Sequence, residues 1–270
     1  MQSNSPYPDA TVLATARQDV PWLSVVVPTY NCAACLPEAL ASLARQTERD
    51  FEVVISDGAS TDETRAIAEA ARAGLPSLKL LSRPDQGVYD AINLAVQASS
   101  GAWVYVMGSD DRLHADDTLT QARRLMEDTQ ANLVYGDVRV LGANQMVEDG
   151  GRYGGPFTLA RLMGQNICQQ AIFYRRSLFE TAGLFDVRFR LWADWDFAQR
   201  VFATQPAQWL NLVVADYAAT GMSTGTLDKL FMQTQRQRLF ALWRASPFNL
   251  AVPQAVFRQA YWDWRKRRAI

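Results

Sequence analysis

Short apolar runs alternate with stretches of helical periodicity in the first half of the chain, and this alternation restricts the fold more than any other feature. The apolar runs, each followed by small or polar residues, are 23–27, 51–55, 78–81 and 103–107. The stretches with helical periodicity are 35–46, 61–73 and 88–99. Strands separated by helices predict βαβ units and a parallel sheet covered on both faces. The sequence therefore predicts an α/β fold with a Rossmann-like, mostly parallel central sheet flanked by helices.

The chain divides into three parts by composition. Residues 1–20 are rich in Ser, Pro, Asp, Ala and Thr without a clear period, and they predict a flexible tail. Residues 21–226 predict one α/β domain, and 227–270 predict a helical C-terminal extension that is aromatic and ends in a basic run. Because 49% of the residues are hydrophobic, the chain has enough apolar side chains for a sizeable core.

Charge and hydropathy narrow the set of partners and the location. The formal net charge of −1 gives no overall attraction to nucleic acid. No signal peptide and no run of about 18 apolar residues is present, so we expect a cytoplasmic protein. The aromatic and basic segment 248–268 leaves two alternatives open, a helix packed on the domain with a solvated tail or contact with the inner face of the membrane.

Three cysteines are present, and two of them form a C-x-x-C pair, Cys32 and Cys35. Such a pair is compatible with redox chemistry or with zinc. The third cysteine is Cys168 and the single histidine is His114, so no second C-x-x-C pair exists to complete a zinc site. We favour packing as the role of these thiols.

Polar or small residues follow all four predicted strands. They are Thr29, Tyr30 and Asn31, then Asp57 and Gly58, then Arg83 and Asp85, and finally Ser109, Asp110 and Asp111. In open α/β sheets, ligands bind at the carboxyl ends of the strands. We therefore expect these residues to face one crevice.

The adjacent acids Asp110 and Asp111 are the candidate metal site. Neighbouring carboxylates repel unless a positive charge compensates them, and oxygen ligands suit Mg²⁺ or Mn²⁺. A cation held there would stabilise a leaving nucleoside diphosphate. The alternative is that both acids precede a helix that begins near Ala115.

The other crevice residues each allow two interpretations. Asp57 could accept a hydrogen bond from a nucleobase or only from its own turn, and Tyr30 could stack on a base or be a rim aromatic. Gly87 precedes a helix whose free N–H groups suit phosphate oxygens. Asp90 and Asn93 share one face of that helix, although Asn93 could instead be a packing amide.

Two acids among tryptophans, Asp194 and Asp196, are candidates for a general base. A carboxylate in a partly apolar wall has a raised pKa, which suits proton abstraction. Asp196 lies four residues before Arg200, a spacing typical of a helical ion pair. We therefore favour Asp194 as the base and Asp196 as a structural residue.

These segments occur in one order: P-T-Y-N at 28–31, S-D-G-A-S-T-D at 56–62, G-V-Y-D-A-I-N at 87–93, S-D-D at 109–111 and A-D-W-D at 193–196. In that order they resemble family 2 glycosyltransferases, and more narrowly the bacterial branch that makes surface polysaccharide. The resemblance covers residues 23 to about 205. It implies the GT-A fold and an inverting, single-displacement mechanism.

By motif position, the resemblance also implies residue roles. Tyr30 and Asp57, with Pro28 in the same motif, would bind the base of the nucleotide. Asp90, Asn93, Ser109 and Asp110 would lie near the donor sugar, ribose or phosphates. Asp111 would bind a divalent cation, Mn²⁺ or Mg²⁺, and Asp194 would deprotonate the acceptor.

The implied reaction moves one sugar from a nucleoside-diphosphate sugar to a hydroxyl of a saccharide or lipid-linked saccharide. We expect UDP as the carrier, with GDP and dTDP open. No Q-x-x-R-W motif follows Asp194, which favours single transfer. Where many relatives carry Asp or Asn, this chain has Gly108, and only Asp57 is acidic where many have two acids. The alternatives are a non-catalytic nucleotide-sugar binding protein and a sugar nucleotidyltransferase; the latter would need a basic, Gly-rich loop after the first strand.

Overall fold

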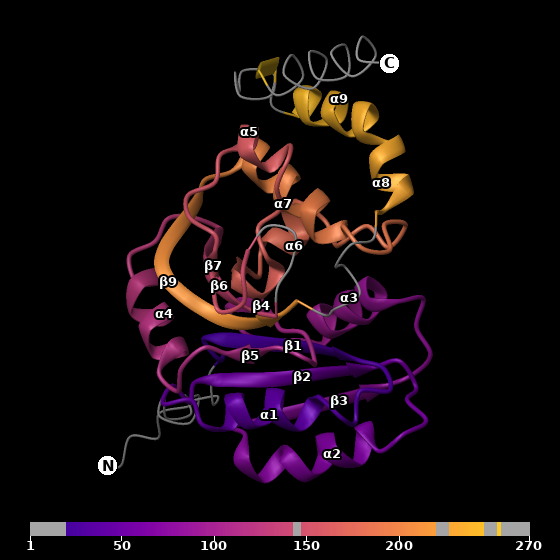
Figure 1. Ribbon diagram of the computed structural model, residues 1–270, viewed down its shortest axis with the longest axis vertical. Helices are drawn as coiled ribbons and strands as arrows, with labels where there is room; N and C mark the ends of the chain where they lie inside the picture. The colour runs from indigo at the N-terminus through magenta and orange to yellow at the C-terminus, as the bar shows by residue number, and fades with distance from the viewer. Residues whose placement is uncertain (1–19, 143–146, 220–226, 246–252, 255–270) are drawn as a thin grey trace, which may run out of the picture.

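A computed structural model describes residues 20–142, 147–219, 227–245 and 253–254. Most of the predicted N-terminal tail, the loop at 221–223 and the basic run at 265–268 lie outside these residues. Figure 1 shows one sheet that curves through the molecule, with helices on both sides of it.

The sheet is parallel in its first half and mixed in its second. Its described strands follow the order β3 (Leu78–Ser82), β2 (Phe51–Asp57), β1 (Leu23–Thr29), β4 (Trp103–Val106), β8 (Ile172–Arg175), β6 (Leu133–Leu141), β9 (Ala207–Ala218) and β5 (Arg112–Leu113). The first four are parallel, β8 is antiparallel to both neighbours, β6 and β9 are parallel, and β5 is antiparallel to β9. The short β7 (Arg152–Tyr153) pairs with β6. The predicted mostly parallel α/β sheet is confirmed.

Alternate residues of the central strands pack on opposite faces of the sheet. Val25 and Val53 belong to the core that includes α1 (Leu36–Ala44), α2 (Thr64–Ala70) and α4 (Thr118–Met126). Val26 and Val54 belong to the core that includes α3 (Val88–Ala98), α6 (Leu178–Thr181) and α7 (Ala193–Thr204). Since side chains alternate along a strand, continuous apolar runs mark strands buried on both faces.

The chain reverses direction across the sheet at β1. From β1 it runs through β2 to β3 on one side, and then returns to place β4 on the other side of β1. Such a switch point opens a crevice at the carboxyl ends of the strands. The loops after β1 and β4, which carry the first and fourth predicted motifs, border this crevice.

Two details differ from the sequence prediction. The helix expected at 61–73 begins at Thr64 and ends in a 3₁₀ turn, η1 (Ala71–Gly74), and the Ser60 hydroxyl does not cap it. That hydroxyl instead binds Asp57 and the Asn31 amide. The long strand β9 was not predicted, because its apolar residues are interrupted by Asn211 and Asp216.

The C-terminal extension begins as two short helices, α8 (Lys229–Gln233) and α9 (Gln235–Ala245). Asp228 caps α8 by accepting a hydrogen bond from the Phe231 amide. Arg238 of α9 donates to Gln199 of α7 at 2.7 Å, which fixes the extension on that helix. No helix among the described residues is long and apolar enough to cross a membrane.

Candidate active site

The loops that follow β1 and β2 are joined by hydrogen bonds at the crevice. Asn31 adopts a left-handed conformation with φ of 48°. Its amide donates to Ser60 Oγ at 2.9 Å, and its Oδ1 accepts from the Thr61 amide at 2.9 Å. Asn tolerates this backbone region better than most residues. The motif Asn therefore fixes one loop against the other, and Tyr30 beside it is left 67% exposed.

Asp57 lies where expected, at the end of β2, but its oxygens are already engaged. Oδ1 accepts from Thr29 Oγ1 and Ser60 Oγ, and Oδ2 accepts from the Ser60 amide and Ser82 Oγ. Burial tends to raise the pKa of Asp57, and these hydrogen bonds outweigh it and hold the pKa below its usual value. A carboxylate has about four acceptor sites, so a nucleobase would have to displace one of these donors.

A second acid at the crevice, Asp85, was not assigned a role by the motifs. A Cβ built on Gly58 would lie 2.6 Å from Asp85 Oδ2 and 3.3 Å from Tyr30 Cδ2. The small residue therefore lets the Asp85 carboxylate and the Tyr30 ring approach each other. The other oxygen, Oδ1, accepts from the Gly87 amide at 2.9 Å. Proximity to Tyr30, which sequence spacing does not show, is the signal that marks Asp85.

The two predicted residues of α3 differ in position. Asp90 accepts from the Gln86 amide at 3.0 Å, near Gly87, whose φ of 123° requires glycine. Asn93 is buried, and both of its amide atoms bind the backbone of Phe185, at 2.9 and 3.1 Å. These two hydrogen bonds fasten the loop before α7 to α3, which supports the packing interpretation of Asn93.

Asp110 and Asp111 converge beside Gly108, while Ser109 lies against the thiol of Cys32. Asp110 is exposed and Asp111 is 2% exposed. A Cβ built on Gly108 would lie 2.9 Å from Asp110 Oδ1 and 2.4 Å from Asp111 Oδ2. The absence of a side chain at Gly108 therefore leaves the space that these two carboxylates occupy.

Asp111 is held in place by two donors. Its Oδ2 accepts from Gln170 Nε2 at 2.7 Å and its Oδ1 from the Ala218 amide at 3.0 Å. Burial, and then the charge of Asp110, raise the pKa of Asp111 to about 7.

These two carboxylates fit a divalent cation. Mg²⁺ and Mn²⁺ are commonly held by one or two carboxylates, with phosphate oxygens and water completing the shell. Like charges at Asp110 and Asp111 raise the cost of ionising the buried acid, which a cation would remove. Within the described ranges, no group of three or more His, Cys, Asp or Glu could hold a metal ion.

Asp194 lies in the first turn of α7 and is 7% exposed. Its Oδ1 accepts from the Tyr89 hydroxyl at 2.7 Å and its Oδ2 from Asn166 Nδ2 at 2.7 Å. Burial raises the pKa of Asp194, and the two hydrogen bonds oppose that effect only in part. A buried carboxylate with a raised pKa and neutral partners suits proton abstraction.

Asp196, two residues further on, has different surroundings. It forms ion pairs with Arg200 at 2.9 Å and with Arg238 of α9 at 3.4 Å. Two guanidinium groups therefore occupy the Asp196 carboxylate, which supports a structural role for it. The predicted Asp196–Arg200 pair is present, and it ties α7 to the C-terminal extension.

One five-residue segment contacts both functional carboxylates. Asn166 donates to Asp194, and Gln170 donates to Asp111. Between them, the Cys168 thiol donates to Gln170 Oε1 at 3.0 Å, and its pKa is raised well above normal by burial and then by the charges of Asp111 and Asp194. Asn166, Gln170 and Tyr89 were not predicted as site residues, because their roles follow from contacts distant in sequence.

The cysteine pair lies in the loop between β1 and α1. Cys32 and Cys35 are free thiols, and Cys32 is buried. Burial raises the pKa of the Cys32 thiol, which lowers its reactivity.

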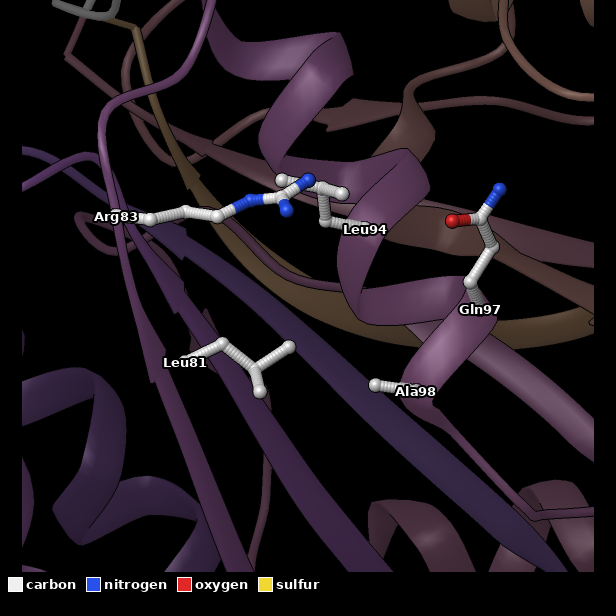
Figure 2. Close-up of a pocket in the computed structure, with 5 residues that line it drawn as sticks. All are labelled: Leu81, Arg83, Leu94, Gln97 and Ala98. Atoms are coloured by element: carbon white, nitrogen blue, oxygen red, sulfur yellow. The ribbon is translucent and has the colours of Figure 1, made fainter.

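A separate cavity of about 340 Å³ lies beside α3, lined by Leu81, Arg83, Leu94, Gln97 and Ala98. Figure 2 shows Arg83 extending toward Leu94 across a largely aliphatic surface. No predicted site carboxylate lines this cavity, so we do not place the chemistry there.

A crevice at the switch point of an α/β sheet, with a carboxylate pair and a buried candidate for a general base, is typical of an enzyme site. The chain matches the Glycosyl transferase family 2 model over residues 24–180. It therefore belongs to glycosyltransferase family 2, as the motif order suggested, and is a glycosyltransferase.

Relatives match the chain over different lengths. A PGL/p-HBAD biosynthesis glycosyltransferase of Mycobacterium tuberculosis is 40% identical over 260 residues, covering 92% of this chain and 99% of the relative. The hyaluronan synthase of Pasteurella multocida is 31% identical over 116 residues, covering 43% of this chain and 12% of that protein.

Solved structures confirm the GT-A fold. The S. aureus TarS structure superposes with a TM-score of 0.71 at 21% identity and covers 87% of this chain, which spans 42% of that larger protein. The mannosyltransferase PcManGT from Pyrobaculum calidifontis was solved with GDP-Man and Mn²⁺. It superposes with a TM-score of 0.58 at 21% identity, covering 89% of this chain and 75% of that one.

Proposed function

We propose that this protein is a metal-dependent, inverting glycosyltransferase that moves one hexosyl group from a nucleoside-diphosphate sugar to an acceptor hydroxyl. The observation that carries the proposal is that one segment, 166–170, holds both Asp111 and Asp194. The shortness of this segment, and the electrostatic interaction of its Cys168 thiol with both carboxylates, support one shared site for the candidate cation ligand and the candidate general base. A non-catalytic binding protein would need neither group so positioned.

The chain's own residues suit the steps of such a transfer. Tyr30, Asp57 and Asp85 would border the position of the donor's nucleobase. Asp110 and Asp111 would hold the cation, which supplies charge compensation for the leaving diphosphate. Asp194 takes the proton of the acceptor hydroxyl as its oxygen attacks the anomeric carbon from the face opposite the leaving group. The carbon–oxygen bond to the diphosphate breaks in the same step.

The relatives guide the choice of donor and acceptor. TarS has been solved with UDP and with UDP-GlcNAc, and PcManGT with GDP-Man, so UDP is our first choice of carrier and GDP the second. The mycobacterial relative is named for PGL/p-HBAD biosynthesis. We propose a lipid-linked or otherwise amphipathic acceptor on that ground.

Exposed apolar side chains on the C-terminal extension support contact with a membrane surface. They are Leu227 (67% exposed), Leu230 (38%), Met232 (49%), Phe240 (55%) and Trp243 (45%). The Phe240 and Trp243 rings lie 5.9 Å apart, and Arg244 lies over Phe240. Aromatic and basic side chains together suit the headgroup region of a bilayer. An enzyme with a lipid-linked acceptor would benefit from this contact.

The test is calorimetric binding of UDP, GDP and dTDP, each with Mn²⁺ and with EDTA, followed by sugar release from the matching nucleotide sugars. We expect one nucleotide to bind with Mn²⁺ and to bind at least tenfold more weakly with EDTA. If neither the nucleotides nor the intact nucleotide sugars bind with Mn²⁺, the proposed function is wrong.

A further inference from the structure

The hydroxyl of Tyr89 lies between two acceptors that its single hydrogen cannot serve at once. It is 2.7 Å from Asp194 Oδ1 and 2.7 Å from the carbonyl oxygen of Leu191. The residue is buried in the first turn of α3, and its ring packs on Phe185 with centroids 5.8 Å apart. Since a phenol carries one hydrogen, Asp194 and Leu191 compete for it.

We propose that Tyr89 is the positioning residue for Asp194, and that its hydrogen bond follows the charge of that carboxylate. While Asp194 is ionised, the Tyr89 hydroxyl donates to Oδ1. Once Asp194 is protonated, its new O–H donates to the Tyr89 oxygen, and the Tyr89 hydrogen turns to the Leu191 carbonyl. For catalysis, this rests on the proposed function: the O–H bond of the acceptor breaks, an O–H bond forms on Asp194, and Tyr89 keeps its own hydrogen throughout.

Both acceptors of Tyr89 are anchored from the far side. The Leu191 amide donates to Asp228 Oδ2 at 3.1 Å, so the C-terminal extension holds the residue whose carbonyl oxygen accepts from Tyr89. Asn166 holds the other oxygen of Asp194 at 2.7 Å. With both acceptors fixed, turning the phenolic hydrogen is the smallest motion that follows a change in charge. Burial raises the pKa of Tyr89 well above normal, which keeps the donor protonated.

The other groups around Asp194 do not offer the same hydrogen bond. Tyr174 of β8 and Cys168 lie close enough to interact with it electrostatically, but the Tyr174 hydroxyl has no hydrogen-bond partner among the described residues. The arginines near this turn of α7 pair with Asp196 instead. Within the part of the chain that the structure describes, Tyr89 and Asn166 thus donate the side-chain hydrogen bonds to the Asp194 carboxylate.

The experiment is a carboxyl-carbon NMR titration of the full chain without ligand, from about pH 4 to pH 9. Asp194→Asn identifies the Asp194 signal by its loss. In Tyr89→Phe we expect the midpoint of Asp194 to rise by about one pH unit, because a hydrogen bond to the ionised form is removed. Tyr174→Phe is the matched control, since Tyr174 also packs on Phe185, at 5.9 Å, and lacks the bond to Asp194. In Tyr174→Phe the midpoint of Asp194 should stay within about 0.3 pH units of the wild-type value.

A second readout tests the turning of the hydrogen without any substitution. The Trp192 amide belongs to the same peptide group as the Leu191 carbonyl, so its nitrogen shift should follow the Asp194 titration in the wild-type protein. The response should vanish in Tyr89→Phe. The inference is overturned if the Asp194 midpoint is unchanged in Tyr89→Phe, or if it shifts equally in Tyr174→Phe. It is also overturned if the Trp192 amide nitrogen shift does not change as Asp194 titrates. Sugar transfer by Asp194→Asn would instead overturn the proposed base while leaving the Tyr89 shift intact.

Discussion

Replacing Gly108 with alanine tests the arrangement of the two acids at the end of β4. The backbone at Gly108 does not lie in the left-handed region, so alanine can adopt its conformation. The new Cβ would, however, lie 2.4 Å from Asp111 Oδ2 and 2.9 Å from Asp110 Oδ1. The effect is therefore steric and directed at the two carboxylates.

The size of the effect follows from the hydrogen bonds of Asp111. Restoring ordinary contact requires Asp111 Oδ2 to move by about 1 Å. Such a shift stretches the 2.7 Å bond from Gln170 Nε2 beyond hydrogen-bond range. A lost hydrogen bond to a charged group costs about 1.5–3 kcal/mol, which is roughly a 10- to 100-fold loss in cation-dependent nucleotide affinity.

The assay is calorimetric titration of UDP, and then of GDP, into Gly108→Ala in the presence of Mn²⁺. Gly164→Ala is the matched control, because a Cβ there would meet nothing within 4 Å. Thermal unfolding of both variants separates lost binding from lost folding. If Gly108→Ala folds and binds the nucleotide with wild-type affinity, Asp110 and Asp111 do not form the cation site in the way described.

Three further changes should act at separate points of the structure. Burial and then the charge of Asp110 raise the pKa of Asp111 to about 7, so Mn²⁺ affinity should fall as the pH drops below 7. Gln170→Leu removes a hydrogen bond to the Asp111 carboxylate and should move that fall to higher pH. Calorimetry at pH 6, 7 and 8 checks this, and an unshifted pH dependence in the variant would contradict it. Glu52 has its pKa lowered to about 2, because bonds from Lys79, Ser24 and Ser100 outweigh the effect of burial. It should therefore add stability above pH 4.5 that is lost as the pH falls toward 2. Glu52→Gln should lower the free energy of unfolding at pH 7 by about 2 kcal/mol and flatten its dependence on pH in that window, as measured by urea denaturation; a wild-type pH dependence would argue against it. Arg238→Ala should lower the free energy of unfolding by about 2 kcal/mol and speed hydrogen exchange in α9. The reason is that it removes the bonds to Gln199 and Asp196 and the contact with the Phe231 ring. Unchanged exchange in α9 would show that the extension is held by other contacts.

The sequence predicted the parallel half of the sheet because those strands are buried on both faces and read as continuous apolar runs. β1 and β2, with every residue of β2 buried, illustrate this pattern. β9 escaped prediction because Asn211 and Asp216 interrupt its apolar residues, so it shows neither one continuous apolar run nor a regular alternation. Its pairing with β6 also contains register shifts between Tyr135 and Val138, and no local pattern in the sequence marks them.

The site was predicted as a set of motifs, but the contacts of each side chain required the fold. The order of the motifs pointed to Asp111 and Asp194, whereas spacing could not show that Asn93 binds Phe185, 92 residues away. Nor could it show that Tyr89 reaches Asp194, 105 residues away. Hydrogen-bond partners so distant in sequence depend on how α3 and α7 pack on the same face of the sheet.

The most direct test of the account is to compare substitutions of Asp194 and Asp196, because only Asp194 is assigned as the general base. Sugar release from the nucleotide sugar that the wild-type enzyme uses should be measured for Asp194→Asn and Asp196→Asn, together with Mn²⁺-dependent nucleotide binding. We expect Asp194→Asn to bind the nucleotide within about twofold of wild type and to lose at least a thousandfold in turnover. Asp196→Asn should keep most of its turnover and lose stability, because Arg200 and Arg238 lose their partner. If Asp196→Asn abolishes turnover while Asp194→Asn retains it, the base has been assigned to the wrong residue.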